Sequence, residues 1–278
     1  NRMMIGDDEH GWADDSVFNF EGGCYAKCIN LSAEKEPDIY NAIKFGALVE
    51  NVVMDPETRE FDFDDDSLAE NSRVGYPVDY IPNAELSGMA TSAPKTVIFL
   101  TADAYGVLPP ISKLDKNQAM YYFVSGFTSK LAGTEIGITE PVPTFSTGLG
   151  EPRLPLAPPD YPNTHPEKVE KSGANVYLVN TGWNGTGKRM KLAYTRAMIT
   201  AALNGTLENS EFVTDPIFGV SVPTTCEGVP SELMIPINTW EDKAAYEAKA
   251  KELAKSFVEN FKKYTHMSEE VVAAGPKA

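Results

Sequence analysis

The sequence is poor in the residues that mark disulfide-linked proteins and in the long apolar runs that mark membrane proteins. Only 3 of its 278 residues are cysteine, an odd number that indicates a reducing compartment rather than a disulfide framework. No apolar run approaches the length of a membrane span. The start shows no basic segment followed by an apolar stretch and a small-residue cleavage site. We therefore expect a cytoplasmic protein without a membrane partner.

Basic residues are also scarce in this chain. It has 24 Lys and Arg residues against 40 Asp and Glu residues, which gives a formal net charge of -16. The basic residues are scattered, whereas a surface that binds nucleic acid needs them clustered, so we expect no nucleic-acid partner. An anionic ligand must then be bound by a few well-placed cations, and the sequence offers Lys27, Arg73, Lys188 and Arg189. Each of them could also be an ordinary surface cation.

The spacing of apolar residues predicts an α/β fold. A hydrophobic content of 42% is ample for a packed core. Several β-rich runs lack alternation, as expected of a sheet that is covered on both faces. Strands are predicted at residues 3–5, 25–30, 51–54, 60–63, 96–101, 175–180 and 218–222, with a hairpin turn at residues 55–58. Helices are predicted at residues 37–50, 116–131, 195–203 and 240–264, and the last has an apolar stripe at Tyr246, Ala250, Leu253, Phe257 and Phe261.

Residues 5–12 contain three consecutive carboxylates and an imidazole. Asp7, Asp8 and Glu9 follow an apolar run and precede His10. If that run ends a buried strand, the carboxylates lie at the carboxyl edge of a sheet, where α/β proteins bind ligands. Hard cations such as Mg²⁺ and Mn²⁺ prefer oxygen ligands, so the motif predicts a metal site. A solvated turn with His10 as a satisfied neighbour is the alternative.

Residues 180–189 have the glycine spacing of a phosphate loop. The pattern Gly182-x-x-x-x-Gly187-Lys188 follows an apolar run, but Arg189 stands where such a loop needs Ser or Thr to hold Mg²⁺. A guanidinium has only donors and a permanent positive charge, so it is no metal ligand. The segment is therefore not a working phosphate loop. Its two cations still suit an anionic or aromatic ligand, because a guanidinium stacks on a ring as readily as it binds a phosphate.

Taken together, these segments resemble the ATP-dependent phosphoenolpyruvate carboxykinases. The similarity is carried by residues 5–12, 18–27, 70–73, 99–110, 126–135, 137–141, 180–189 and 273–276. It implies the C-terminal nucleotide-binding α/β domain of that family over residues 1–278, with a mixed sheet and flanking helices. Members carry their phosphate loop shortly before the segment that matches residues 5–8, whereas this chain begins at Asn1. We therefore expect part of a longer protein whose missing N-terminal half holds the phosphate loop, the Lys and His that complete the transition-metal site, and most oxaloacetate-binding groups.

The resemblance also implies a reaction and its cofactors. Oxaloacetate and ATP would give phosphoenolpyruvate, ADP and CO₂. Mn²⁺ would stabilise the enolate left by decarboxylation, and Mg²⁺ would assist phosphoryl transfer from ATP. Part of the proline-rich stretch at residues 133–165 would be a mobile lid that excludes water, although a connecting surface loop is the alternative. Two other functions stay open: an inert or merely nucleotide-binding fragment, and a related kinase that acts on another acceptor.

Four residues match family groups that act on the metals and phosphates. Asp8 matches the direct Mn²⁺ ligand, and Asp7 would serve the Mg²⁺ of the nucleotide through bound water. Arg73 matches an arginine that reaches both the nucleotide phosphates and the substrate, a role that suits its rigid fork of donors. Lys27 matches a lysine near the transferred phosphate. We expect these four residues to form the catalytic part of the site in this chain.

Another four residues match family groups on the nucleoside side. Glu36 matches an acid that meets the ribose, and Thr195 supplies a hydroxyl near the base. Arg189 and Met190 match the pair that borders the adenine. Most members have Ile where this chain has Met190, and a thioether is an acceptable apolar wall. Glu36 could instead complement a helix dipole, and Thr195 could be a helix cap.

Overall fold

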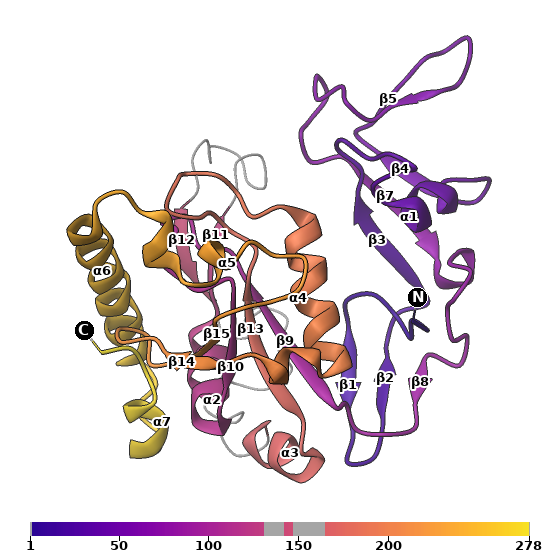
Figure 1. Cartoon of the computed structure of the whole chain (residues 1–278). Coiled ribbons are helices and arrows are strands. Elements are labelled where there is room, and N and C mark those ends of the chain that lie inside the picture. The colour runs from indigo at the N-terminus through magenta and orange to yellow at the C-terminus, as the bar shows by residue number, and fades with distance from the viewer. Residues whose placement is uncertain (1, 131–141, 147–164, 278) are drawn as a thin grey trace. The chain divides into compact units, whose positions relative to one another are not determined.

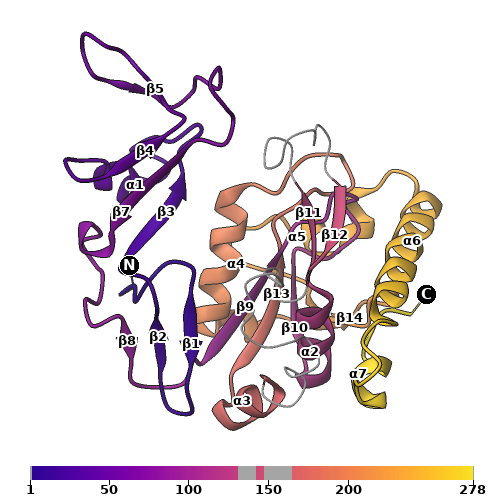
Figure 2. The same cartoon turned by 180° about the vertical axis from the view of Figure 1, so that it is seen from behind.

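The computed structural model describes residues 2–130, 142–146 and 165–277. These residues form two compact units, of which the first comprises residues 2–94 and the second comprises the rest. Figures 1 and 2 show the elements of each unit from two sides. In the described part of the chain, no helix is both long enough and apolar enough to cross a membrane.

The second unit is built on a mixed sheet, as predicted, and this sheet has five strands. Its strand order is β14-β15-β10-β13-β9. The strands are β9 (Thr96–Thr101), β10 (Ile111–Leu114), β13 (Asn175–Asn180), β14 (Phe212–Thr214) and β15 (Ser221–Pro223). β9 and β13 pair in parallel from Thr96–Asn175 to Thr101–Asn180, and the other pairs are antiparallel. The predictions for residues 96–101 and 175–180 are therefore confirmed, and both strands bring their carboxyl ends to one edge.

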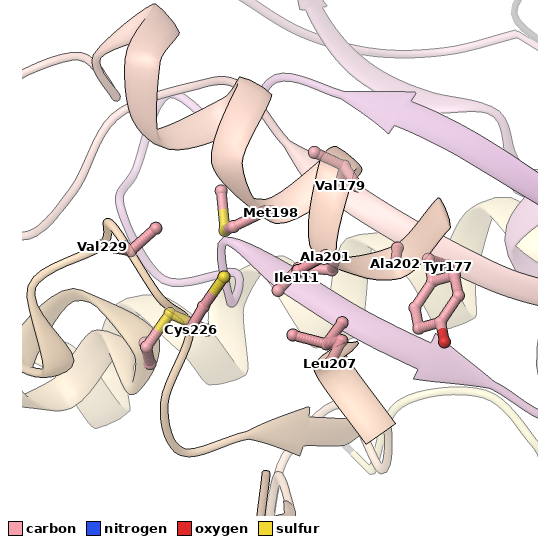
Figure 3. Packing of buried hydrophobic residues seen from close by; sticks show 10 residues of the cluster. Ile111, Tyr177, Val179, Met198, Ala201, Ala202, Leu207, Cys226 and Val229 are labelled. Carbon is pink, nitrogen blue, oxygen red and sulfur yellow. The ribbon is translucent and has the colours of Figure 1, made fainter. Parts of the chain in front are cut away.

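Helices cover both faces of this sheet, because residues along β13 alternate between two cores. Tyr177 and Val179 belong to one buried cluster that also contains Met198, Ala201 and Ala202 of α4 (Leu192–Asn204) (Figure 3). Leu178 points the other way and lines a cavity of about 200 Å³ together with Tyr122 of α2 (Lys116–Ser125) and Phe257 of α6 (Lys243–Phe261). The cluster drawn in Figure 3 is Ile111, Tyr177, Val179, Met198, Ala201, Ala202, Leu207, Cys226, Val229 and Met234. The predicted sheet with two covered faces is thus present.

The long helix α6 buries the stripe that its sequence predicts. All five residues of that stripe are buried. Asp242 caps the helix by accepting hydrogen bonds from the N–H groups of Ala244 and Ala245. Phe261 stacks on Tyr121 of α2, with ring centroids 4.0 Å apart. The apolar period of this helix therefore predicted its buried face, although α6 begins later and ends earlier than the predicted range of 240–264.

The predicted helix at 116–131 ends early. Gly126 adopts a left-handed conformation with φ of 54° and stops α2 after Ser125. The chain then forms β11 (Phe127–Lys130), which pairs antiparallel with β12 (Val142–Phe145). The strand predicted at 218–222 also starts later, at Ser221. A turn in which the Asp215 carboxylate accepts from two backbone N–H groups occupies the first positions. Local capping outweighed the apolar pattern at both places.

The first unit contains two small antiparallel sheets and a hairpin. One sheet has the order β3-β7-β4 and consists of β3 (Gly23–Lys27), β7 (Arg73–Pro77) and β4 (Leu48–Glu50). The other has the order β1-β2-β8 and consists of β1 (His10–Trp12), β2 (Val17–Asn19) and β8 (Met89–Ala90). The hairpin joins β5 (Val53–Met54) to β6 (Phe61–Asp62). Its turn is the predicted one, and the Asp55 carboxylate accepts from the N–H groups of Glu57 and Thr58 at 2.8 Å each.

Several predictions for the first unit are wrong, and the strand predicted at 25–30 ends early because β3 stops at Lys27. Residues 3–5 form no strand: Met4 makes only an isolated bridge with Ala84, and Met3 stays exposed. The helix predicted at 37–50 is only α1 (Pro37–Ala42). It ends because Ile43 leaves the helical conformation and Gly46 has a φ of 98°.

The predicted strand at 51–54 is interrupted as well. Asn51 has a φ of 56°, so β4 ends at Glu50 and β5 begins only at Val53. The remaining short elements are α3 (His165–Ser172), α5 (Ser231–Met234), α7 (Glu269–Ala273) and the 3-10 turns at Val78–Tyr80, Thr206–Asn209 and Pro236–Thr239.

Candidate functional site

Asp7 and Asp8 lie in an exposed bend that is fastened to the open edge of β3. β3 is an edge strand, and the Tyr25 N–H on its open side donates to Asp7 Oδ2 at 3.1 Å. The Glu21 carboxylate accepts from the N–H groups of Asp8 and Glu9 at 3.0 and 3.1 Å. The bend is therefore held by backbone donors that bind carboxylates, rather than by the end of a buried strand.

The carboxylates of this bend repel one another. Partial withdrawal of the Asp7 carboxylate from water raises its pKa, and the negative charges of Asp8 and Glu21 raise it further, although the Tyr25 N–H lowers it. Among the described residues, none hydrogen-bonds the exposed Asp8 carboxylate. His10 Nδ1 lies 3.2 Å from the Asp8 carbonyl oxygen, as the solvated-turn alternative expects. A cation beside Asp7 and Asp8 would relieve the repulsion, so the charge of the bend suits a divalent metal.

The described residues do not by themselves complete a metal centre. Within residues 2–130, 142–146 and 165–277, no group of three or more His, Cys, Asp or Glu side chains is placed to hold an ion. The nearby thiols of Cys24 and Cys28 are buried and unpaired with each other, and burial raises the pKa of each to about 11. Asp7 and Asp8 thus offer oxygen donors that fit Mg²⁺ or Mn²⁺, but a tightly held ion needs further ligands.

The exposed face of the β3-β7-β4 sheet brings two of the four predicted cations together. Lys27 on β3 stands directly opposite Arg73 on β7. On the other side of β7, Glu50 of β4 also stands opposite Arg73. Side chains that oppose each other across antiparallel strands share a face, and like charges in such pairs are destabilising. Lys27 and Arg73 therefore place two positive charges side by side on one face, an arrangement that suits an anionic ligand.

Two neighbours fix the Arg73 side chain. Its Nε donates to Asn71 Oδ1 at 2.9 Å, and its guanidinium lies 5.4 Å from the centroid of the Tyr25 ring. The phenol of Tyr25 in turn donates to the Glu50 carboxylate. Sequence reasoning found Arg73 and Lys27 but missed Tyr25, although its alternation with Lys27 along a strand was a usable signal.

Glu36 occupies the position that precedes α1. It is the residue before Pro37, and its side chain makes no capping hydrogen bond to the helix. The alternative that Glu36 complements the helix dipole is compatible with this place at the N-terminus. Its proposed contact with a ribose stays a prediction.

In the second unit, the backbone N–H groups of the glycine-rich segment at residues 182–188 are already hydrogen-bonded within the protein. Each backbone N–H from residue 182 to 188 has an acceptor within the protein: Asn180 Oδ1 for 182, Asp103 O for 183, Lys188 O for 184, Thr239 Oγ1 for 185, Asn184 Oδ1 for 186 and 188, and Asn184 O for 187. A phosphate loop binds phosphate with such N–H groups. This arrangement agrees with the conclusion from Arg189 that the segment is not a working phosphate loop.

Arg189, Met190 and Thr195 lie at the junction between this segment and α4. Arg189 is exposed, its Nε donates to Thr181 O at 3.3 Å, and its guanidinium lies 5.4 Å from the Trp183 ring centroid. The Met190 N–H donates to Gly182 O at 2.7 Å. Thr195 is buried and sits one turn inside α4, whose capping position is Lys191. The alternative that Thr195 caps this helix is therefore wrong.

Asp103 and Asn180 build the loops at the carboxyl ends of β9 and β13, and sequence reasoning missed both. The buried Asp103 carboxylate accepts from the N–H groups of Tyr105, Val107 and Leu108 at 2.7 to 2.9 Å. Burial raises its pKa, against the effect of these hydrogen bonds. Asp103 and Asn180 both lie at the carboxyl ends of strands that the sequence predicts, and this position was the signal that could have identified them.

The predicted lid at 133–165 lies outside the described residues, apart from residues 142–146 and 165.

Comparison with known proteins places the chain in a family. The phosphoenolpyruvate carboxykinase family matches residues 1–232. The chain is 60% identical over 282 residues to "Phosphoenolpyruvate carboxykinase (ATP)" of Fusobacterium nucleatum, covering 100% of this chain and 54% of that protein. It is 61% identical over 279 residues to the protein of the same name from Lysinibacillus sphaericus, covering 99% and 53%. The chain thus spans about half the length of these relatives, and it belongs to the family of ATP-dependent phosphoenolpyruvate carboxykinases.

Proposed function

We propose that this chain is the nucleotide-binding part, over residues 1–278, of a cytoplasmic phosphoenolpyruvate carboxykinase that acts in gluconeogenesis. The reaction converts oxaloacetate and ATP to phosphoenolpyruvate, ADP and CO₂. The observation that carries the proposal is the exposed face of the β3-β7-β4 sheet, where Lys27 and Arg73 oppose each other. Asp7 is bonded to the edge strand of the same sheet. A pair of cations beside a pair of carboxylates suits a phosphate chain together with its divalent metals.

Asp8 and Asp7 would hold the metals. The Asp8 carboxylate is the exposed donor of the bend, so it would bind Mn²⁺ directly, while Asp7 would serve Mg²⁺ through water. Bound metal would supply charge stabilisation for the enolate and the phosphates. The raised pKa of Asp7 supports this assignment, because a cation favours the charged form of a carboxylate that its neighbours disfavour. Since the described residues offer fewer than three donors, we propose that the rest come from the longer protein.

Arg73 and Lys27 would bind the anionic groups that react. The Arg73 fork suits bidentate contact with a phosphate or a carboxylate, and the ammonium of Lys27 is a compact charge for the transferred phosphate. Because both cations project from opposed positions of rigid strands, they would bring their charges together without a loop rearrangement. We expect loss of Arg73 to reduce turnover more than binding.

We propose roles for four residues on the nucleoside side, each taken from its own surroundings. Arg189 and Met190 would border the adenine and Thr195 would contact it, while Glu36 would meet the ribose. The exposed Arg189 guanidinium already lies 5.4 Å from the Trp183 ring centroid, which supports a contact between this group and an aromatic base. The segment at residues 133–165 would close over the nucleotide as a lid that excludes water.

The test compares the longer protein with this chain in an assay of oxaloacetate-dependent ADP formation. We expect activity in the longer protein and none in the chain alone, because the described residues of this chain do not complete a metal centre. Asp8→Asn in the longer protein should weaken Mn²⁺ binding at least tenfold. Asp15→Asn, which also removes an exposed carboxylate from the first unit, should leave it unchanged. Titration of ATP against GTP tests nucleotide choice. Absence of activity from the longer protein would refute the proposal and favour a kinase with another acceptor.

A further inference from the structure

The Tyr25 side chain spans three strands on the exposed face of the β3-β7-β4 sheet. It starts on β3 and passes over Gly75 of the central strand, where an added Cβ would lie 3.6 Å from Tyr25 Cδ2. Its hydroxyl then donates to the Glu50 carboxylate on β4. Because residue 75 is glycine, the Tyr25 ring meets no side chain where it crosses the central strand.

The same ring lies beside the Arg73 guanidinium. The ring centroid is 5.4 Å from Arg73 Cζ, within the range of a cation–π contact. Asn71 holds the Nε edge of the guanidinium at 2.9 Å. Among the described residues, none pairs with the two terminal nitrogens of Arg73. Two contacts therefore fix the plane and one edge of the guanidinium, and the terminal nitrogens remain available to a ligand.

Glu50 has a role of its own in this arrangement. It stands opposite Arg73 across the strands, where an ion pair would be expected, yet no ion pair joins the two residues. Its carboxylate instead accepts the Tyr25 phenol, and this hydrogen bond is the largest cause of the raised pKa of Tyr25. Glu50 thus holds the Tyr25 ring in place without forming an ion pair with the Arg73 guanidinium.

We propose that Tyr25, held by Glu50, is a positioning residue that orients the Arg73 guanidinium for bidentate binding of an oxyanion. Orientation before binding lowers the entropy lost when a long side chain is immobilised on a ligand. The identity of the oxyanion, a nucleotide phosphate or the substrate carboxylate, rests on the proposed function. The orientation itself depends only on the contacts of Tyr25, Glu50, Asn71 and Arg73.

The first test measures the mobility of the guanidinium by NMR in the 278-residue chain. Exchange of the Arg73 Hε proton with water is compared in the wild type, Tyr25→Phe and Tyr25→Leu, with Arg73→Lys used to assign the signal. We expect exchange to accelerate severalfold in Tyr25→Leu and less in Tyr25→Phe, which retains the ring. Tyr80→Leu is the matched control, because Tyr80 also contacts a cation, Lys44 at 4.1 Å, in the same unit.

Equal exchange rates in the wild type, Tyr25→Phe and Tyr25→Leu would overturn the inference, and so would equal acceleration by Tyr80→Leu. Tyr25→Phe keeps the size and the ring of the side chain, so it tests the Glu50 contact even if Tyr25→Leu fails to fold. Glu50→Gln should match Tyr25→Phe or fall closer to the wild type, because its amide oxygen still accepts the phenol hydrogen.

The second test measures catalysis in the longer protein. Tyr25→Leu should lower kcat/KM about twofold to fivefold, the ratio expected for an exposed cation–π contact. It should cause no further loss in an Arg73→Gln background, because the effect passes through Arg73. Independent, multiplicative losses would overturn the inference. An inactive longer protein whose NMR behaviour is as expected would instead refute the proposed function alone.

Discussion

Truncation of Phe257 tests how α6 stabilises the second unit. The Phe257 side chain is fully buried. Five aromatic rings lie around it with centroids 5.0 to 6.5 Å away, namely Tyr121, Tyr122, Phe127, Phe145 and Phe218. Phe257→Ala removes these contacts and leaves a cavity, at a cost of about 3–5 kcal/mol in the free energy of unfolding. With a urea dependence of about 1–3 kcal/mol per molar, the midpoint should fall by roughly 1 M or more.

The measurement must report on the second unit alone, because two units need not unfold together. In a Trp12→Phe background, the remaining tryptophans, Trp183 and Trp240, both belong to that unit. Their fluorescence during urea unfolding then gives the midpoint. Val258→Ala is the control, since it changes the next residue of the same helix, where the side chain is 36% exposed, and should cost about 1 kcal/mol or less. Equal shifts for Phe257→Ala and Val258→Ala would refute the reasoning.

Three further predictions concern the candidate site and its surroundings. Folding raises the pKa of Asp7, so the protonated carboxyl stabilises the folded state. This stabilisation is fully present at a pH below the pKa of Asp7 in the unfolded chain, and it is lost as the pH rises through the pKa of Asp7 in the folded chain. Asp8→Asn should lower the Asp7 pKa in a carbon-13 NMR titration, and no decrease would contradict the repulsion. Asn184→Ala removes the acceptor of two loop N–H groups, so exchange of the Thr186 and Lys188 amides should be about fivefold faster by NMR, with unchanged rates refuting the loop role. The three buried cysteines should react with a thiol reagent at pH 8 far faster in denaturant than in buffer, because burial raises the pKa of each thiol and leaves little of the reactive thiolate. Rapid reaction of the folded chain would contradict their burial.

Long periodic segments were predictable, whereas places where one residue changes the backbone were not. α6 and the parallel strands β9 and β13 follow their sequence patterns closely, because each is decided by many apolar residues at once. The helices predicted at 37–50 and 116–131 ended early, at Ile43 and at Gly126 respectively. A single left-handed or extended residue stops a helix whatever pattern follows it, so boundaries are the weakest part of such predictions.

The candidate site shows the same division. The acidic motif and the two cations were visible in the sequence because charged residues in a recognisable context carry chemical information. The prediction of which element holds the acidic motif was wrong. Residues 3–5 form no strand, and the Tyr25 N–H of β3 holds Asp7 instead. That N–H is available only because β3 is an edge strand, which is a property of sheet order and not of the local sequence.

The sequence by itself determined the family, the α/β class, the charge balance and the identity of the residues proposed to bind metal and phosphate, since each follows from residue type and spacing. Only the tertiary structure decided that Lys27 and Arg73 stand opposite each other and that the Tyr25 ring lies beside Arg73. It also decided that the N–H groups of the glycine-rich segment donate to acceptors within the protein. These relations depend on strand register and loop closure. Both are set by contacts between residues far apart in the chain, which no local pattern contains.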